Sequence, residues 1–167
     1  NDIDLDPDEK INAIKLISSA CGKNGMVYGQ FLDIENESKE INIETIENIH
    51  SLKTGKLIEC AVMLGQIGNN IIQQNEILLK FSKKIGLAFQ ITDDILEVTS
   101  DEKTLGKNIN SDRKNKKSTY INVLGIDEAI KRSKELSKSA ILDISILKLK
   151  EADMLIELAK YISYRER

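Results

Sequence analysis

The sequence predicts an all-α fold, a bundle of amphipathic helices. Its 167 residues include one proline and no tryptophan, and Ile, Leu, Lys and Glu recur at helical spacing along most of the chain. Alternation of apolar and polar residues, which is typical of strands, is nowhere sustained. The length is sufficient for one domain with its own core, so we expect a single domain.

The first two helices are short and are separated by a polar break. Pro7 and Asp8 suit the first turn of a helix that extends to about Cys21, where the residues GKNG interrupt it. The next apolar segment, residues 26–35, predicts the second helix.

The third helix begins at Asn42, an N-cap candidate, and extends to about Gly65. Within it, Lys53, Thr54 and Gly55 interrupt a strong helical pattern. A kink that exposes backbone carbonyl groups would explain them, and so would a surface lysine beside a tolerated glycine.

The longest periodic segment covers residues 71–99 and is followed by a polar loop at 100–118, which contains Gly106. Two terminal helices, at 127–147 and 151–164, carry the mixed charges of helices with one solvent-facing side.

Charge and cysteine usage limit the function. The 24 basic and 27 acidic residues give a net charge of −3, so the chain as a whole offers no reason to expect nucleic acid or an anionic membrane as a partner. No apolar stretch approaches the roughly 20 residues that a membrane span needs. Cys21 and Cys60 lie in periodic apolar segments without metal-ligand spacing, which favours buried thiols and a cytoplasmic protein.

Four polar residues share one side of the long helix. Gln90, Asp93, Asp94 and Glu97 fall within an arc of roughly 100°, because they form i,i+4 pairs. Apolar residues cover most of the remaining surface of this segment. We therefore expect the acids to point into a polar cavity, where their mutual repulsion calls for protons or a cation.

Mg²⁺ fits this requirement, since it binds to one or two carboxylates together with water and phosphate oxygens. Lys107 and Lys117 follow the acids in the sequence and are suited to contact phosphate oxygens, whereas the neighbouring Arg113, Lys114 and Lys116 are expected to be solvated. An acidic surface patch followed by a solvated basic loop explains the same residues and stays open as an alternative. His50, the one histidine, has no partner that suggests a triad or a zinc site, and we expect it to be structural.

Four motifs resemble, in order and spacing, the C-terminal half of the trans-isoprenyl diphosphate synthases, or polyprenyl synthetases, and in particular the bacterial farnesyl diphosphate synthases (geranyltranstransferases). These motifs are GMVYGQFLDI, KTGKLIECAVMLG, IGLAFQITDDILE and TLGKNINSDRKNKKSTY. The resemblance implies an isoprenoid-synthase helical bundle around a central cavity. It also implies that residues 1–167 are the C-terminal half of the domain, without the first aspartate-rich motif.

The resemblance assigns roles to residues present here. Asp93, Asp94 and Glu97 resemble the metal ligands of the second aspartate-rich motif, with Asp93 in direct contact with Mg²⁺. Substrate-binding residues would be Lys53, Thr54, Gln90, Lys107 and Lys117, of which the catalytic residues are Lys53, Thr54 and Gln90. Gln30 and Asp33 match supporting positions on a neighbouring helix.

The implied reaction is the Mg²⁺-dependent condensation of an allylic diphosphate, geranyl or dimethylallyl, with isopentenyl diphosphate to give farnesyl diphosphate. The implied partners are these two substrates, the missing N-terminal half of the same protein and a second copy in a homodimer. The fragment alone is expected to be inactive. Glu97 departs from the family pattern, which commonly has aspartate there, but it keeps the charge.

Two other functions stay open at this point. The chain could be a non-catalytic scaffold or dimerisation fragment that kept the fold. A class I terpene cyclase also ionises allylic diphosphates, but Leu5 and Glu97 stand where its second metal motif needs Ser or Thr.

Overall fold

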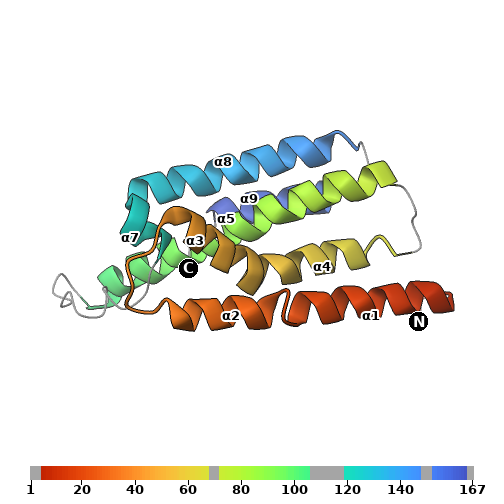
Figure 1. The fold of residues 1–167 in the computed structure, drawn as a ribbon. Coiled ribbons are helices and arrows are strands. Elements are labelled where there is room, and N and C mark those ends of the chain that lie inside the picture. The colour runs from red at the N-terminus through yellow and green to blue at the C-terminus, as the bar shows by residue number, and fades with distance from the viewer. Residues whose placement is uncertain (1–4, 68–71, 106–118, 148–151, 165–167) are drawn as a thin grey trace.

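The structure is a computed structural model that describes residues 5–67, 72–105, 119–147 and 152–164. Every regular element within these ranges is a helix, as predicted. In Figure 1, α1 and α2 lie end to end along one edge of the bundle, and the next segment, residues 43–64, runs back beside them.

The N-terminal helices follow the predicted pattern. Helix α1, Pro7–Cys21, begins with a capping box in which the Asp6 side chain accepts a hydrogen bond from Glu9 N at 2.8 Å and Glu9 returns the contact to Asp6 N. Helix α2 covers Met26–Glu35. The spans at 7–21 and 26–35 therefore match the sequence prediction.

The predicted kinked helix is three consecutive elements. Helix α3, Ile43–His50, begins after Asn42, whose side chain accepts from Thr45 N at 2.9 Å. It continues into a π-helix, η1, Ser51–Gly55, and then into α4, Lys56–Leu64. The interruption predicted at Lys53, Thr54 and Gly55 is confirmed as a π turn.

Helix α5, Ile72–Leu105, is longer than predicted. The polar loop was expected to begin at Ser100, but the first residue in this region that disfavours a helix is Gly106, and the helix continues up to it. A short helix that was not predicted, α7, Tyr120–Leu124, follows the N-cap Thr119. Five residues are too few to show a helical period.

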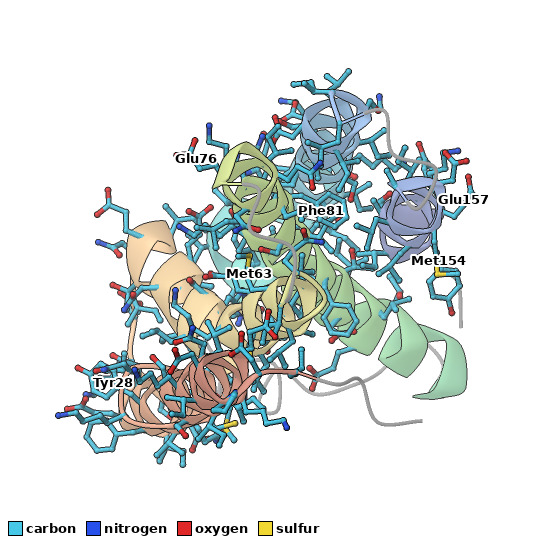
Figure 2. The ribbon with its side chains drawn as sticks, turned by 90° about the vertical axis from the view of Figure 1, so that its right-hand side faces the viewer. Tyr28, Met63, Glu76, Phe81, Met154 and Glu157 are labelled. Atoms are coloured by element: carbon cyan, nitrogen blue, oxygen red, sulfur yellow. The ribbon has the colours of Figure 1, made fainter. Side chains whose placement is uncertain are left out.

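Helices α8, Ile126–Ser145, and α9, Ala152–Tyr164, complete the described bundle close to their predicted bounds. The main apolar core lies where α5 meets α8 and α9, and it includes Phe81, Ile85 and Ile144. Figure 2 shows Phe81 inside the bundle, with Tyr28 and Met154 at its outer surface. A second core around Ile46, Ile91 and Tyr120 joins α3, α5, α7 and α8, directly beside the polar residues described next.

Candidate active site

The π-helix η1 presents Lys53 and Thr54 next to each other at the side of the bundle. In this segment Lys56 N donates to Ser51 O, the wider spacing of a π turn. Such turns are frequent at functional sites because they redirect neighbouring side chains.

Glycines allow α2 and α5 to pack directly against η1. A Cβ atom at Gly29 of α2 would lie 2.2 Å from Lys53 N, and one at Gly86 of α5 would lie 3.0 Å from Gly55 Cα. Backbone therefore meets backbone on both sides of η1, which fixes the π segment between two helices.

Lys53 is paired within the site. Its Nζ donates to Asp33 Oδ2 of α2 at 2.7 Å, with both side chains about one-third exposed, 35% and 33%. Asp33 is one of the two supporting residues that the resemblance placed on a neighbouring helix. The ion pair keeps the ammonium group at the surface of the cluster, where an anion can reach it.

Thr54 and Gln90 are in direct contact. Thr54 Oγ1 donates to Gln90 Oε1 at 2.7 Å, which joins η1 to α5. Because Gln90 Oε1 is the acceptor here, the amide nitrogen of Gln90 stays available for the carboxylate one turn further along α5, whose pKa the Gln90 side chain lowers.

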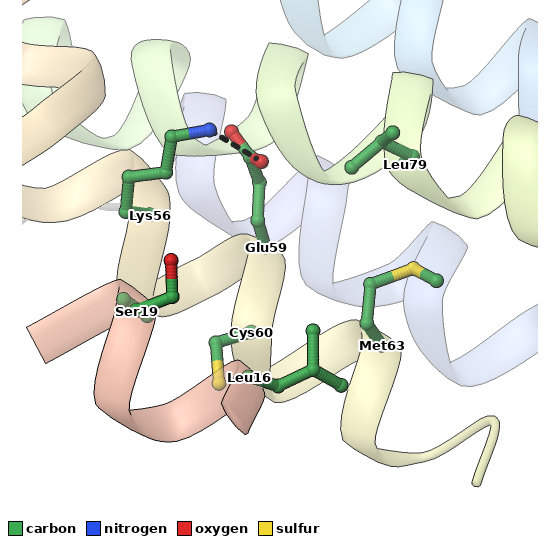
Figure 3. A pocket seen from close by; sticks show the side chains of 8 residues that line it. Leu16, Ser19, Lys56, Glu59, Cys60, Met63 and Leu79 are labelled. Carbon is green, nitrogen blue, oxygen red and sulfur yellow. Dashed lines mark hydrogen bonds and ion pairs between the residues drawn. The ribbon is translucent and has the colours of Figure 1, made fainter. Parts of the chain in front are cut away.

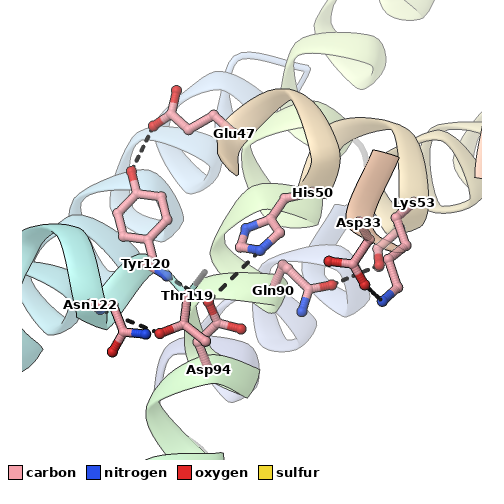
Figure 4. Close-up of polar contacts among 10 residues, drawn as sticks. Asp33, Glu47, His50, Lys53, Gln90, Asp94, Thr119, Tyr120 and Asn122 are labelled. Atoms are coloured by element: carbon pink, nitrogen blue, oxygen red, sulfur yellow. Dashed lines mark hydrogen bonds and ion pairs between the residues drawn. The ribbon is translucent and has the colours of Figure 1, made fainter. Parts of the chain in front are cut away.

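That carboxylate belongs to Asp94, which is buried, with 6% of its surface exposed. Its Oδ2 accepts from Tyr120 N at 3.0 Å, and His50 Nε2 lies 3.7 Å from the same oxygen (Figure 4). Burial raises the pKa of Asp94 to about 6, and the charges of Glu97 and Asp33 act in the same direction. Hydrogen bonds from Tyr120 N and from the Gln90 side chain oppose this increase.

His50 is buried beside Asp94. Burial lowers the pKa of its imidazole to about 4, so the ring is neutral at pH 7. The 3.7 Å separation is too long for a hydrogen bond, so neutral His50 gives Asp94 no strong electrostatic partner. No residue spacing indicates this contact, since 44 positions separate His50 from Asp94 in the sequence.

For the other predicted site residues the structure gives either the exposure of the side chain or no position. Asp93 is half-buried on α5, and Glu97 is exposed one helical turn further along. Lys107 and Lys117 lie outside the described residues. Lys53, Thr54, Gln90 and Asp94 are thus brought together, and Glu97 is close enough for its charge to act on Asp94.

The donor set of this cluster fits Mg²⁺. In the described ranges, no three His, Cys, Asp or Glu side chains are arranged as a metal site. Mg²⁺ does not need three, because it is held by one or two carboxylates, with water and phosphate oxygens as the remaining ligands. Burial is the main cause of the raised pKa of Asp94, and the negative charges of Glu97 and Asp33 add to it; a bound cation would offset these charges.

The comparisons with known proteins decide the family. The family model for polyprenyl synthetase matches residues 4–154. The chain belongs to the polyprenyl synthetase family. It is 44% identical over 124 residues to farnesyl diphosphate synthase of Micrococcus luteus, covering 74% of this chain and 43% of that protein. It is 39% identical over 163 residues to farnesyl diphosphate synthase of Escherichia coli K12, covering 95% and 54%.

A solved structure agrees with this assignment. Geranyltransferase from Helicobacter pylori, complexed with magnesium and isoprenyl diphosphate, superposes with a TM-score of 0.77 at 31% identity, covering 95% of this chain and 52% of the other. The polyprenyl synthetase chain described here spans about half the length of the curated relatives it matches. Its isoprenoid-synthase fold, predicted from the four motifs, is confirmed.

The polyprenyl synthetase fold also contains a cavity of about 180 Å³ between α1, α4 and α5. The side chains that line it are mainly apolar, with a Lys56–Glu59 ion pair at 3.0 Å on one side (Figure 3). None of the polar site residues lines this cavity, and it begins one residue beyond η1.

Sequence reasoning missed two residues that connect to the site. Tyr120 Oη donates to Glu47 Oε1 at 2.6 Å, and Arg132 Nη2 donates to the same oxygen at 3.4 Å. Glu47 and Arg132 lie on different helices, α3 and α8, and read as ordinary surface charges in the sequence. In the sequence, only Thr119 and Tyr120, which end the fourth motif, indicated that this part of the chain belongs near the site.

Proposed function

We propose that this chain supplies the second aspartate-rich motif and the diphosphate-binding lysines of a farnesyl diphosphate synthase type of prenyltransferase. The observation that carries the proposal is the gathering of Lys53, Thr54, Gln90 and Asp94 from two elements that are far apart in the sequence. The relatives named farnesyl diphosphate synthase support the substrate class, which is an allylic diphosphate and isopentenyl diphosphate.

The proposed reaction begins when the C–O bond of the allylic diphosphate breaks and pyrophosphate leaves. Lys53, with Lys107 and Lys117, neutralises charge that builds on the leaving group. Mg²⁺, held by Asp93 directly and by Asp94 and Glu97 through water, would supply Lewis-acid stabilisation of the same oxygens.

The allylic cation then alkylates the double bond of isopentenyl diphosphate, and the released proton passes to the pyrophosphate. Thr54 is held by its hydrogen bond to Gln90, so the lone pairs of its oxygen remain available to face the cation. No protein nucleophile takes part, which is consistent with the chemistry of the residues gathered here.

We further propose that the complete enzyme is a cytoplasmic homodimer in which residues 1–167 form the C-terminal half of the domain. Large apolar side chains on α1 and α2 are exposed in the described chain and support burial in an assembly; these are Ile11, Ile14, Ile17, Val27, Tyr28, Phe31 and Ile34. Both cysteines are free, as expected in a reducing compartment. No described helix is long and apolar enough to cross a bilayer.

The test compares two aspartate substitutions in the complete natural polypeptide that contains this chain. With geranyl diphosphate and radiolabelled isopentenyl diphosphate, Asp93→Ala is expected to lower kcat by about 100-fold or more. The matched control Asp127→Ala removes an exposed acid in the first turn of α8 and is expected to stay within about twofold. Equal losses would contradict the assignment, and the absence of transfer by the unsubstituted protein would favour a non-catalytic scaffold.

The purified 167-residue chain alone is expected to show no transfer above background. The proposed leaving diphosphate is held between two metal-binding walls, and this chain contributes one of them. Robust farnesyl diphosphate synthesis by the chain, with its mass verified, would contradict this part of the proposal.

A further inference from the structure

A series of side-chain and backbone contacts connects the candidate site to Glu47 on α3 and Arg132 on α8. Thr54 donates to Gln90, the Gln90 side chain contacts Asp94, and Asp94 accepts from Tyr120 N. From Tyr120 the series continues through the phenol to Glu47, which also accepts from Arg132. Figure 4 shows the central part of this series, from Glu47 to Gln90.

Tyr120 is held both through its side chain and through its backbone N–H. The residue is 1% exposed, and its ring stacks on His50, with centroids 6.2 Å apart and planes 21° apart. Its phenol is bound to Glu47 at 2.6 Å, a short contact typical of a hydroxyl that donates to a carboxylate. The backbone N–H is the first of α7, so it has no partner within its own helix and is free to bind Asp94.

The contact with Tyr120 determines where the Asp94 carboxylate points. An aspartate side chain can adopt several rotamers, and selecting one requires partners with fixed positions. Neutral His50 at 3.7 Å is a weak partner, so Tyr120 N and Gln90 are the groups that select the orientation of Asp94. Tyr120 in turn is fixed by Glu47 on α3, which Arg132 on α8 supports.

We propose that Tyr120, anchored by Glu47 and Arg132, is a positioning residue that orients Asp94 and, through Gln90, Thr54 for the binding of a divalent cation with diphosphate. This inference rests on the proposed function. It assigns a positioning role to the phenol of Tyr120, although the phenol does not enter the site. The phenol acts through Glu47, more than 70 positions away in the sequence.

The test uses the complete natural polypeptide that contains this chain. Mn²⁺ with inorganic pyrophosphate is the probe, and its binding is followed by electron paramagnetic resonance. Tyr120→Phe removes only the phenol oxygen, and we expect it to weaken Mn²⁺ binding about tenfold, the effect of losing one hydrogen bond to a charged group. Glu47→Ala should have a similar effect. Glu47→Gln keeps an acceptor oxygen and should retain binding within about threefold.

Two further measurements separate positioning from simple loss of fold. Hydrogen exchange of the residue 120 amide should become about tenfold faster in Tyr120→Phe. Tyr161→Phe, a control at a residue that is 65% exposed, should change neither property. Urea unfolding of each variant verifies that binding is compared among folded chains.

The outcomes are distinguishable. If the unsubstituted protein binds Mn²⁺ and pyrophosphate but Tyr120→Phe binds them equally well, the positioning role is wrong while the proposed function stands. If Glu47→Gln is as impaired as Glu47→Ala, the acceptor function assigned to Glu47 is wrong and the proposal falls. If the unsubstituted protein binds neither ligand, the proposed metal site fails, and the positioning role fails with it.

Discussion

Gly29→Ala tests whether the π segment is held by direct backbone packing. The added Cβ would lie 2.2 Å from Lys53 N, 2.6 Å from Lys53 Cα and 2.7 Å from Leu52 C, whereas ordinary contact begins near 3.4 Å. All three are backbone atoms, so no side chain can rotate away. Either α2 or η1 must move by on the order of 1 Å.

The expected cost follows from two opposing effects. Overpacking of this kind costs up to about 3 kcal/mol, and the higher helix propensity of alanine over glycine returns about 1 kcal/mol. We expect a net loss of about 2 kcal/mol in the free energy of unfolding. With a urea m-value of about 2 kcal/mol/M, the unfolding midpoint measured by circular dichroism should fall by about 1 M.

Gly65→Ala provides the matched control, because the nearest atom to its added Cβ is Val62 O at 3.4 Å and its backbone is right-handed α-helical. This variant should unfold at or slightly above the midpoint of the unsubstituted chain. A Gly29→Ala chain as stable as Gly65→Ala would refute the packing argument. The movement should also separate Lys53 from Asp33, so the binding of Mn²⁺ with pyrophosphate should weaken under conditions where the variant is folded.

Two further predictions concern titratable groups. Burial, aided by the charge of Cys21, raises the pKa of the Cys60 thiol. Iodoacetamide should therefore modify Cys60 at least about tenfold more slowly than the half-buried Cys21 in the folded chain, as measured by peptide mass spectrometry. Equal rates would contradict the burial of Cys60. Burial and Glu47 raise the pKa of Tyr120 to about 12, so stability is retained below the usual tyrosine pKa of about 10 and is lost as the pH rises towards 12. The absorbance at 295 nm should show a matching step as the phenol of Tyr120 ionises, and this step should be absent from Tyr120→Phe. A step that persists in this variant would be evidence against assigning it to Tyr120.

The sequence predicted most of the fold because local chemistry determines it. Asp6 and Asn42 begin helices through side-chain caps, and the interruption at Lys53, Thr54 and Gly55 became a π turn. Helix α5 ends later than the polarity of residues 100–105 predicts, because this polar segment contains no residue that breaks a helix.

Residue spacing alone predicted only those contacts of the candidate site that lie on one face of a helix, and the family resemblance predicted Lys53, Thr54 and Asp33. Gln90 and Asp94 are one turn apart on α5, so their contact follows from the period of the helix. The contacts of Asp94 with His50 and Tyr120 depend on how α3 and α7 pack against α5, and no spacing in the sequence encodes that packing. The missed residues Glu47 and Arg132 belong to the same class of long-range contact.

Helical geometry also argues that the two adjacent aspartates have different tasks. Neighbouring residues on an α-helix differ by about 100° in direction, so Asp93 and Asp94 cannot present their carboxylates in the same way. Asp94 faces the interior, where it binds Tyr120 N and lies beside His50, while Asp93 is more accessible. An accessible carboxylate is suited to bind a metal directly, whereas a buried one held by fixed donors is suited to act on the metal through water. The DD pair therefore combines one proposed ligand with one residue that connects the site to the bundle, and this is why a change as distant as Glu47→Ala should alter metal binding.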